Sequence, residues 1–79
     1  MSSSGSDNGM AVVGRNIRTA RGAERQRDLA ARLGVDPMRV SDWERGVHVP
    51  STQNLLALAT ATGRSLAWFY TDHSSERAA

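Results

Sequence analysis

The stretch from Pro37 to Arg45 combines arginine, carboxylate, hydroxyl and apolar side chains at helical spacing. At about 100° per residue, a helix over this stretch has two distinct faces. Its inner face carries Val40, Trp43 and Glu44. Its outer face, with Pro37 and Arg39 at the edges, carries Met38, Ser41, Asp42 and Arg45. Such side chains can meet base edges and phosphates, as a helix in the DNA major groove must. An ordinary helical hairpin with a solvated outer face has the same spacing.

Two helices joined by a tight turn are expected to position this face. The first, over residues 25–33, turns Leu29, Ala30 and Leu33 inward, and Gly34 follows where a helix favours a left-handed residue. Asp36 and Pro37 then supply an N-cap and a first-turn proline, which together predict a sharp helix start. Small and apolar residues at these offsets are typical of a helix-turn-helix unit.

The rest of the chain also has helical patterns and no strand pattern, so the fold class is predicted to be all-α with five helices. The expected helices span 11–21, 25–33, 37–45, a fourth stretch from Pro50-Ser51 to just before Gly63, and 66–70 with Ser65 as its cap. Residues 1–10 are expected to form a disordered arm, 11–70 the helix-turn-helix domain, and 71–79 a flexible tail.

Composition narrows the possible functions of the chain. It has 79 residues, and its ten basic residues, all arginine, stand against eight acidic ones for a net charge of +2. Arginine suits bidentate contacts to phosphate and guanine, although arginine use also follows genome base composition. There is no cysteine, and His48 and His73 lack metal-ligand spacing, so we expect no metal and no cofactor. No catalytic constellation and no membrane segment are seen, which predicts a cytoplasmic protein that is not an enzyme.

Several motifs along the chain resemble the phage-repressor helix-turn-helix domain of Cro/CI (XRE) type. They are Gly14-x-x-Ile17-Arg18, Gln26-x-x-Leu29-Ala30-x-x-Leu33-Gly34-Val35, Val40-Ser41-x-Trp43-Glu44-Arg45-Gly46, Pro50-Ser51, Leu55-x-x-Leu58-Ala59 and Gly63-x-Ser65-Leu66-x-x-Phe69. The resemblance covers residues 13–70 and implies a five-helix lambda-repressor-like fold. It implies a sequence-specific regulator of transcription that binds double-stranded DNA, with a repressor as the first expectation. The resemblance also implies that residues 37–45 read the major groove.

The resemblance also implies roles for individual residues. Gln26 matches a glutamine that contacts a phosphate, although it can also be a merely soluble first-turn residue. Pro37, Met38 and Asp42 match base-reading positions, and Arg45 matches a phosphate-contacting position. His48 follows in the next loop, where it can approach a phosphate or simply face solvent.

The arginines near this segment are assigned from their positions. Arg25 and Arg27 lie at the start of the second helix, where they are expected to add phosphate contacts to that of Gln26. Arg32 is expected to be a solvated surface residue. Asp42 can accept from a cytosine amino group or orient Arg39, three residues before it. Arg39 is the candidate for a bidentate contact to guanine, with a plain phosphate contact or a solvated charge as the alternative.

The chain departs from the family pattern in the connection over residues 22–25, which is about two residues short. The family often pairs a late arginine of the first helix with the glutamate that matches Glu44. The partner is Arg21 if the connection is shortened, which we prefer, or Arg18 if the register shifts. Glu44 can also be a solvated acid.

The last helix leaves Trp68 and Tyr70 as candidates for a dimer contact. Trp68 falls roughly opposite Leu66, so one core cannot bury every large side chain of this helix. Alternatively, Trp68 packs under the C-terminal tail. A homodimer, at least on DNA, fits a pseudo-palindromic operator. Two other functions remain open: an antitoxin that also binds a toxin protein, and a small controller of restriction–modification genes.

Overall fold

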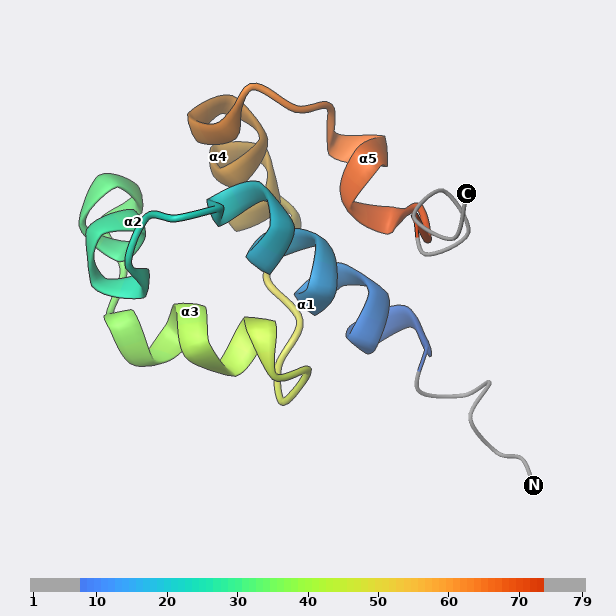
Figure 1. Cartoon of the computed structure of the whole chain (residues 1–79), viewed down its shortest axis with the longest axis horizontal. Helices are drawn as coiled ribbons and strands as arrows, with labels where there is room; N and C mark the ends of the chain where they lie inside the picture. Colours follow the sequence, from blue (N-terminus) through green and yellow to red (C-terminus); the bar gives the residue numbers. More distant parts are fainter. Residues whose placement is uncertain (1–7, 74–79) are drawn as a thin grey trace.

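The computed structural model describes residues 8–73 and contains five helices in this range. They are α1 (Asn8–Arg21), α2 (Gln26–Leu33), α3 (Pro37–Glu44), α4 (Thr52–Thr62) and α5 (Leu66–Tyr70). No strand occurs among these residues, which confirms the all-α, five-helix prediction. In Figure 1, α1 crosses the middle of the molecule, with α3 on one side and α4 and α5 on the other.

Helix boundaries follow the capping residues closely. Asp36, Ser51 and Ser65 are the N-caps of α3, α4 and α5, and each side chain accepts a hydrogen bond from a backbone N–H of the first turn. Gly34 ends α2 with φ of 73°, the left-handed conformation that glycine adopts without steric cost. Arg25 and Arg45 lie just outside α2 and α3, as the N-cap and C-cap residues, whereas the sequence placed them inside.

The expected domain limits are shifted at both ends. Helix α1 begins at Asn8, so residues 8–10 belong to a helix and not to an arm as expected. Beyond α5, His73 still contacts Trp68, so the packed part reaches three residues past the expected limit at residue 70. Residues 1–7 and 74–79, where the rest of the arm and tail were expected, lie outside the described residues.

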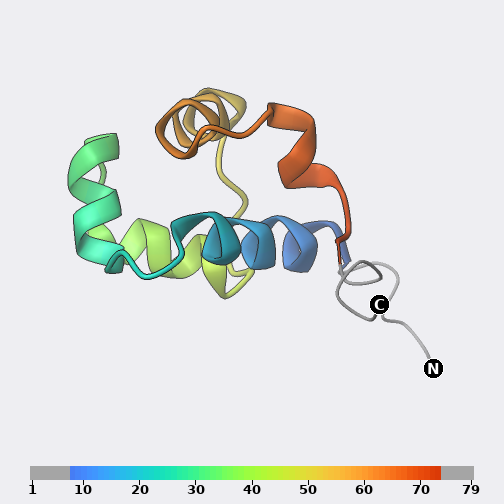
Figure 2. The same ribbon diagram turned by 45° about the horizontal axis from the view of Figure 1, so that its top comes forward.

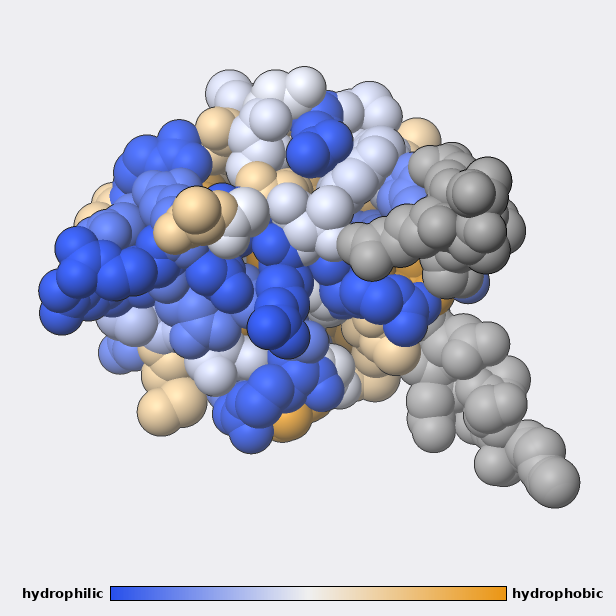
Figure 3. All heavy atoms as spheres, viewed as in Figure 1, coloured by the Kyte–Doolittle hydropathy of each residue, from blue (hydrophilic) through white to orange (hydrophobic). Residues whose placement is uncertain are grey.

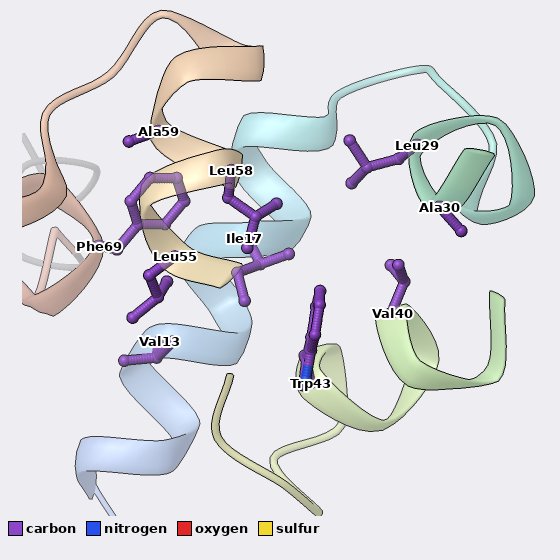
Figure 4. Close-up of a cluster of buried hydrophobic side chains, with 10 residues drawn as sticks. All are labelled: Val13, Ile17, Leu29, Ala30, Val40, Trp43, Leu55, Leu58, Ala59 and Phe69. Carbon is purple, nitrogen blue, oxygen red and sulfur yellow. The ribbon is translucent and has the colours of Figure 1, made fainter. Parts of the chain in front are cut away.

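A single apolar cluster joins all five helices (Figure 4). Its buried members are Val13, Ile17, Leu29, Ala30, Val40, Trp43, Leu55, Leu58, Ala59 and Phe69. Helix α1 packs against α3, α4 and α5, and α2 packs against α3 and α4. Figure 2 shows α3 passing behind α1, and the inner face of α3, with Val40 and Trp43, meets the core. The other face of α3 is left uncovered by the helices.

Candidate nucleic-acid interface

The first half of α3 presents its outer face to solvent. Val40 and Trp43 are buried in the core, whereas Pro37, Met38 and Arg39 are exposed. Met38 keeps 63% of its surface although it is apolar, and its backbone N–H donates to Asp36 Oδ1 over 2.8 Å. The cap and the two buried side chains fix the direction of α3. The exposed face is therefore a rigid surface of the domain.

Arg39 has no side-chain hydrogen bond or ion pair within residues 8–73. Of the two roles considered for Asp42 from the sequence, the structure contradicts the one in which it orients Arg39. Asp42 is bonded to Arg45, whose Nη2 lies 2.5 Å from Asp42 Oδ1 and whose Nε lies 3.3 Å from Ser41 Oγ. The side chain of Arg45 is 58% exposed and that of Asp42 is 20% exposed. Asp42 thus holds the arginine at the C-terminal end of α3, and Arg39 is left without an internal partner.

A buried carboxylate, Glu44, joins the first three helices. Arg21 donates to it through Nε, 2.6 Å from Oε2, and through Nη2, 2.9 Å from Oε1. Gln26 adds a third bond through Nε2, 3.0 Å from Oε1. The side chains of Arg21 and Glu44 are 15% and 5% exposed. The hydrogen bonds to Glu44 raise the pKa of Arg21, and partial burial opposes the rise. We call Arg21, Gln26 and Glu44 the Glu44 junction.

The Glu44 junction decides between the two partners considered from the sequence, because it pairs Glu44 with Arg21 and not with Arg18. It also places Gln26 at the start of α2 with its side-chain amide oriented by a carboxylate. This orientation still leaves one N–H of the amide and its oxygen for an external group. The free N–H groups at the N-terminus of α2 favour an anion at the same place.

Gly14 brings α1 and α3 into close contact. A Cβ at this position would collide with the carbonyl oxygen of Trp43 and lie 2.9 Å from that of Glu44. Only glycine allows the backbones to approach this closely. The approach places Arg21, two turns further along α1, beside Glu44.

The three arginines of the α2 region differ in their surroundings. Arg25 Nε lies 3.1 Å from Asp28 Oδ2, and both side chains are exposed. Arg27 is exposed and has no bonded partner in the described part of the chain. Arg32, expected to be a solvated residue, donates to Glu24 through Nε and Nη2 and to the carbonyl oxygen of Ala61 through Nη1, over 3.1 Å. Arg32 therefore links α2 to α4 and to the connection before α2.

A shallow groove runs between α3 and the segment that leads into α4. Met38, Arg39 and Asp42 line one side, and His48 and Asn54 are among the residues lining the other. His48 is exposed at this edge, and its side chain has no bonded partner among residues 8–73. The groove widens the concave surface next to the exposed face of α3.

The last helix differs from its expected role at Trp68. This side chain is half-buried and contacts Phe69 edge-on, His73 in a stacked arrangement and the guanidinium of Arg64, 4.2 Å from the ring centroid. Trp68 therefore packs within its own chain, which corresponds to the alternative considered from the sequence. Tyr70 remains 53% exposed.

Asn16 was missed by sequence reasoning, although its polar side chain is buried in the described core. It is 4% exposed, and its Nδ2 lies 2.8–3.2 Å from the carbonyl oxygens of Trp68, Phe69 and Thr71. A lone asparagine on the apolar side of a helix is the only signal that points to it. Asn16 caps the C-terminal end of α5 and does not take part in the surface around α3.

Two further features concern the described residues alone. No helix among them has the length and apolar character needed to cross a membrane. Within the same range, no group of three or more metal-ligating side chains lies close enough together to hold an ion.

Comparison with known proteins agrees with this geometry. A family model described as helix-turn-helix matches residues 17–69, which cover all of α2, α3 and α4. No curated protein and no solved structure gave a match. The five-helix arrangement is that of the lambda-repressor-like fold. The chain belongs to the XRE (Cro/CI-like) family of helix-turn-helix proteins and is a DNA-binding transcription regulator.

Proposed function

We propose that the chain is a repressor that binds a specific double-stranded sequence by inserting α3 into the major groove. The exposed face of α3 is the observation that carries this proposal. Pro37, Met38 and Arg39 are open to solvent while Val40 and Trp43 anchor the same helix in the core. A major groove is wide enough for one helix presented in this way.

Among the side chains of this face, Arg39 is assigned to read guanine. It lies in the first turn of α3 after the capped start, and no carboxylate within residues 8–73 neutralises it. Met38 is assigned to apolar contact with a thymine methyl group, for which a flexible thioether side chain is suited. Pro37 offers only its ring. Asp42 is assigned to hold Arg45, because its carboxylate already accepts a hydrogen bond from that arginine.

Contacts to the phosphate backbone are assigned to residues around this face. Gln26 and Arg45 contribute from the ends of α2 and α3, Arg25 and Arg27 from the start of α2, and His48 from the following loop. Such contacts fix the register of the protein on the duplex without reading its sequence. They also make the affinity fall steeply with salt concentration.

Two copies of the chain on a pseudo-palindromic operator complete the proposal. Tyr70 supports a contact between copies because it is a large, exposed side chain at the C-terminal end of α5. Trp68 no longer supports it as strongly, since Arg64 and His73 cover its ring. Two half-sites spaced by one helical turn would be expected in the footprint.

Selection of binding sites from random duplex DNA, followed by a footprint, tests the proposal. We expect one preferred sequence, and Arg39→Ala should reduce discrimination at one base pair by about 10- to 100-fold, the loss of a bidentate base contact. Arg27→Ala is the matched control and should weaken binding to all sequences alike. An unchanged sequence preference in Arg39→Ala would remove its reading role, and no selected sequence from the wild-type chain would overturn the proposed function.

A further inference from the structure

The described residues contain more arginines than acidic residues, so some arginines have no acidic partner. Residues 8–73 contain nine arginines and six acidic residues. Five of these arginines lie in ion pairs with acids, and Arg64 lies against the ring of Trp68. The remaining arginines without a bonded acid in this range are Arg18, Arg27 and Arg39. Each belongs to a different helix, α1, α2 and α3, and only Arg18 has no part in the proposed reading of DNA.

Arg18 lies on the side of α1 that borders the Glu44 junction. Four residues along a helix rotate the side-chain direction by about 40° net, and three residues by about 60° in the opposite sense. Arg18 is therefore the outer neighbour of both Gly14, which touches α3, and Arg21, which bonds Glu44. Arg21 and Gln26 both bond Glu44, and Gln26 is a proposed phosphate contact. Arg18 lies one turn before Arg21 on α1.

The surface around Arg18 is a shallow depression, lined also by Arg15, Thr19 and Gly22. Arg15 adds a second, loosely paired positive charge to this depression, because its ion pair with Asp72 is long, 3.8 Å, and half-exposed. In Figure 3 hydrophilic residues lie over α1, α2 and α3 in this view, with smaller apolar patches among them. Arg18 is exposed in this depression, so an anion can reach it from solvent.

We propose that Arg18 on α1 is a further contact to the DNA backbone, extending the interface beyond the helix-turn-helix unit. This inference rests on the proposed function. Duplex DNA carries one charge for about every 1.7 Å of its axis, so a phosphate next to the one at Gln26 is available to a second cation nearby. A phosphate contact of this kind adds affinity and salt dependence and carries no sequence preference.

The slope of log affinity against log salt measures this contact directly. Each lost phosphate contact should make the slope shallower by about 0.9. We therefore compare the wild-type chain with Arg18→Gln by fluorescence anisotropy between 50 and 200 mM NaCl, on the selected duplex and on an unrelated one. Salt rises fourfold over this range, and a slope difference of about 0.9 corresponds to about 3.5-fold in affinity. Arg18→Gln should therefore lose about 3.5-fold less affinity over this range than wild type does. The change should be equal on both duplexes.

Two further variants separate a local contact from a general charge effect. Arg64→Gln is the control, because it removes the same charge next to α5. Asn16 contacts α5, and Arg18, two residues further along α1, points about 200° away from Asn16 and so to the opposite side of this helix. The slope of Arg64→Gln should stay close to wild type, and Arg18→Lys should restore the slope lost in Arg18→Gln. Circular dichroism melting checks that each variant is folded at the assay temperature.

Equal slopes for Arg18→Gln and Arg64→Gln would overturn the contact at Arg18 while leaving the proposed function intact. A change seen on the selected duplex alone would also overturn it, since a backbone contact acts on every sequence. A wild-type chain that binds neither duplex would instead overturn the proposed function itself. The two failures are therefore distinguishable in one set of measurements.

Discussion

Glu44 and Asp42 lie two residues apart on α3, and each holds an arginine, but the two pairs differ in place and in partners. Glu44 is buried, and its arginine comes from α1 while a glutamine comes from α2. Asp42 is closer to the surface, and its arginine follows it in the same stretch of chain. Pairing across helices fixes their arrangement, whereas pairing within one helix only orients a side chain. The first pair belongs to the architecture of the fold and the second to the surface that meets a ligand.

Removal of the buried acid should have the largest effect. Glu44→Ala leaves the half-buried guanidinium of Arg21 without its carboxylate, and such a change is expected to cost about 3 kcal/mol of the free energy of unfolding. Urea unfolding at neutral pH measures this loss. Replacing both partners by apolar residues, as in Arg21→Met with Glu44→Leu, should cost less than Glu44→Ala alone. A single variant as stable as wild type would contradict the architectural role.

Widening the contact between α1 and α3 should have the next largest effect. Gly14→Ala places a methyl group against the carbonyl oxygens of Trp43 and Glu44, and overpacking of this kind costs about 2 kcal/mol. Ala11→Gly, at an exposed position of the same helix, is the comparison because it changes the same two residue types without touching α3. Thermal unfolding followed by circular dichroism gives both values. If the exposed change cost more than Gly14→Ala, the close approach would be unimportant.

Removal of the surface acid should leave stability almost unchanged. Asp42→Ala breaks a partly exposed pair, whose contribution is expected to stay within about 0.5 kcal/mol. The released Arg45 should instead bind DNA more tightly and with a steeper salt dependence, because a negative charge is lost beside the duplex. Anisotropy titrations on selected and unrelated duplexes measure both quantities. Relaxed preference at a single base pair, with no gain in affinity, would show that Asp42 reads a base after all.

Local patterns in the sequence were enough to predict the five helices and the capped starts of three of them. Asp36, Ser51 and Ser65 act through backbone groups of the next few residues, so their effect is visible in a short window. The pairing of Glu44 with Arg21 was also within reach, because the shortened connection over residues 22–25 leaves few registers. Such features depend on near neighbours or on a motif with known spacing.

The contacts that were missed join segments far apart in the chain. Arg32 reaches the carbonyl oxygen of Ala61, 29 residues further along, and Asn16 reaches the carbonyl oxygens at the end of α5. No periodicity in a single helix indicates where the end of another helix will lie. The alternative in which Asp42 orients Arg39 failed for a related reason, since Arg39 and Arg45 are equally spaced from Asp42 and only the structure distinguishes them.

The amide of Asn16 links an early helix to the very last one. Its three acceptors lie 52 to 55 residues further along the chain, so none of them exists while the ribosome is still making α2, α3 and α4. Until α5 emerges, this amide must stay in contact with water, and α1 cannot settle fully into the core. Nascent chains of this protein are thus expected to remain open to proteases and chaperones until synthesis has passed residue 71.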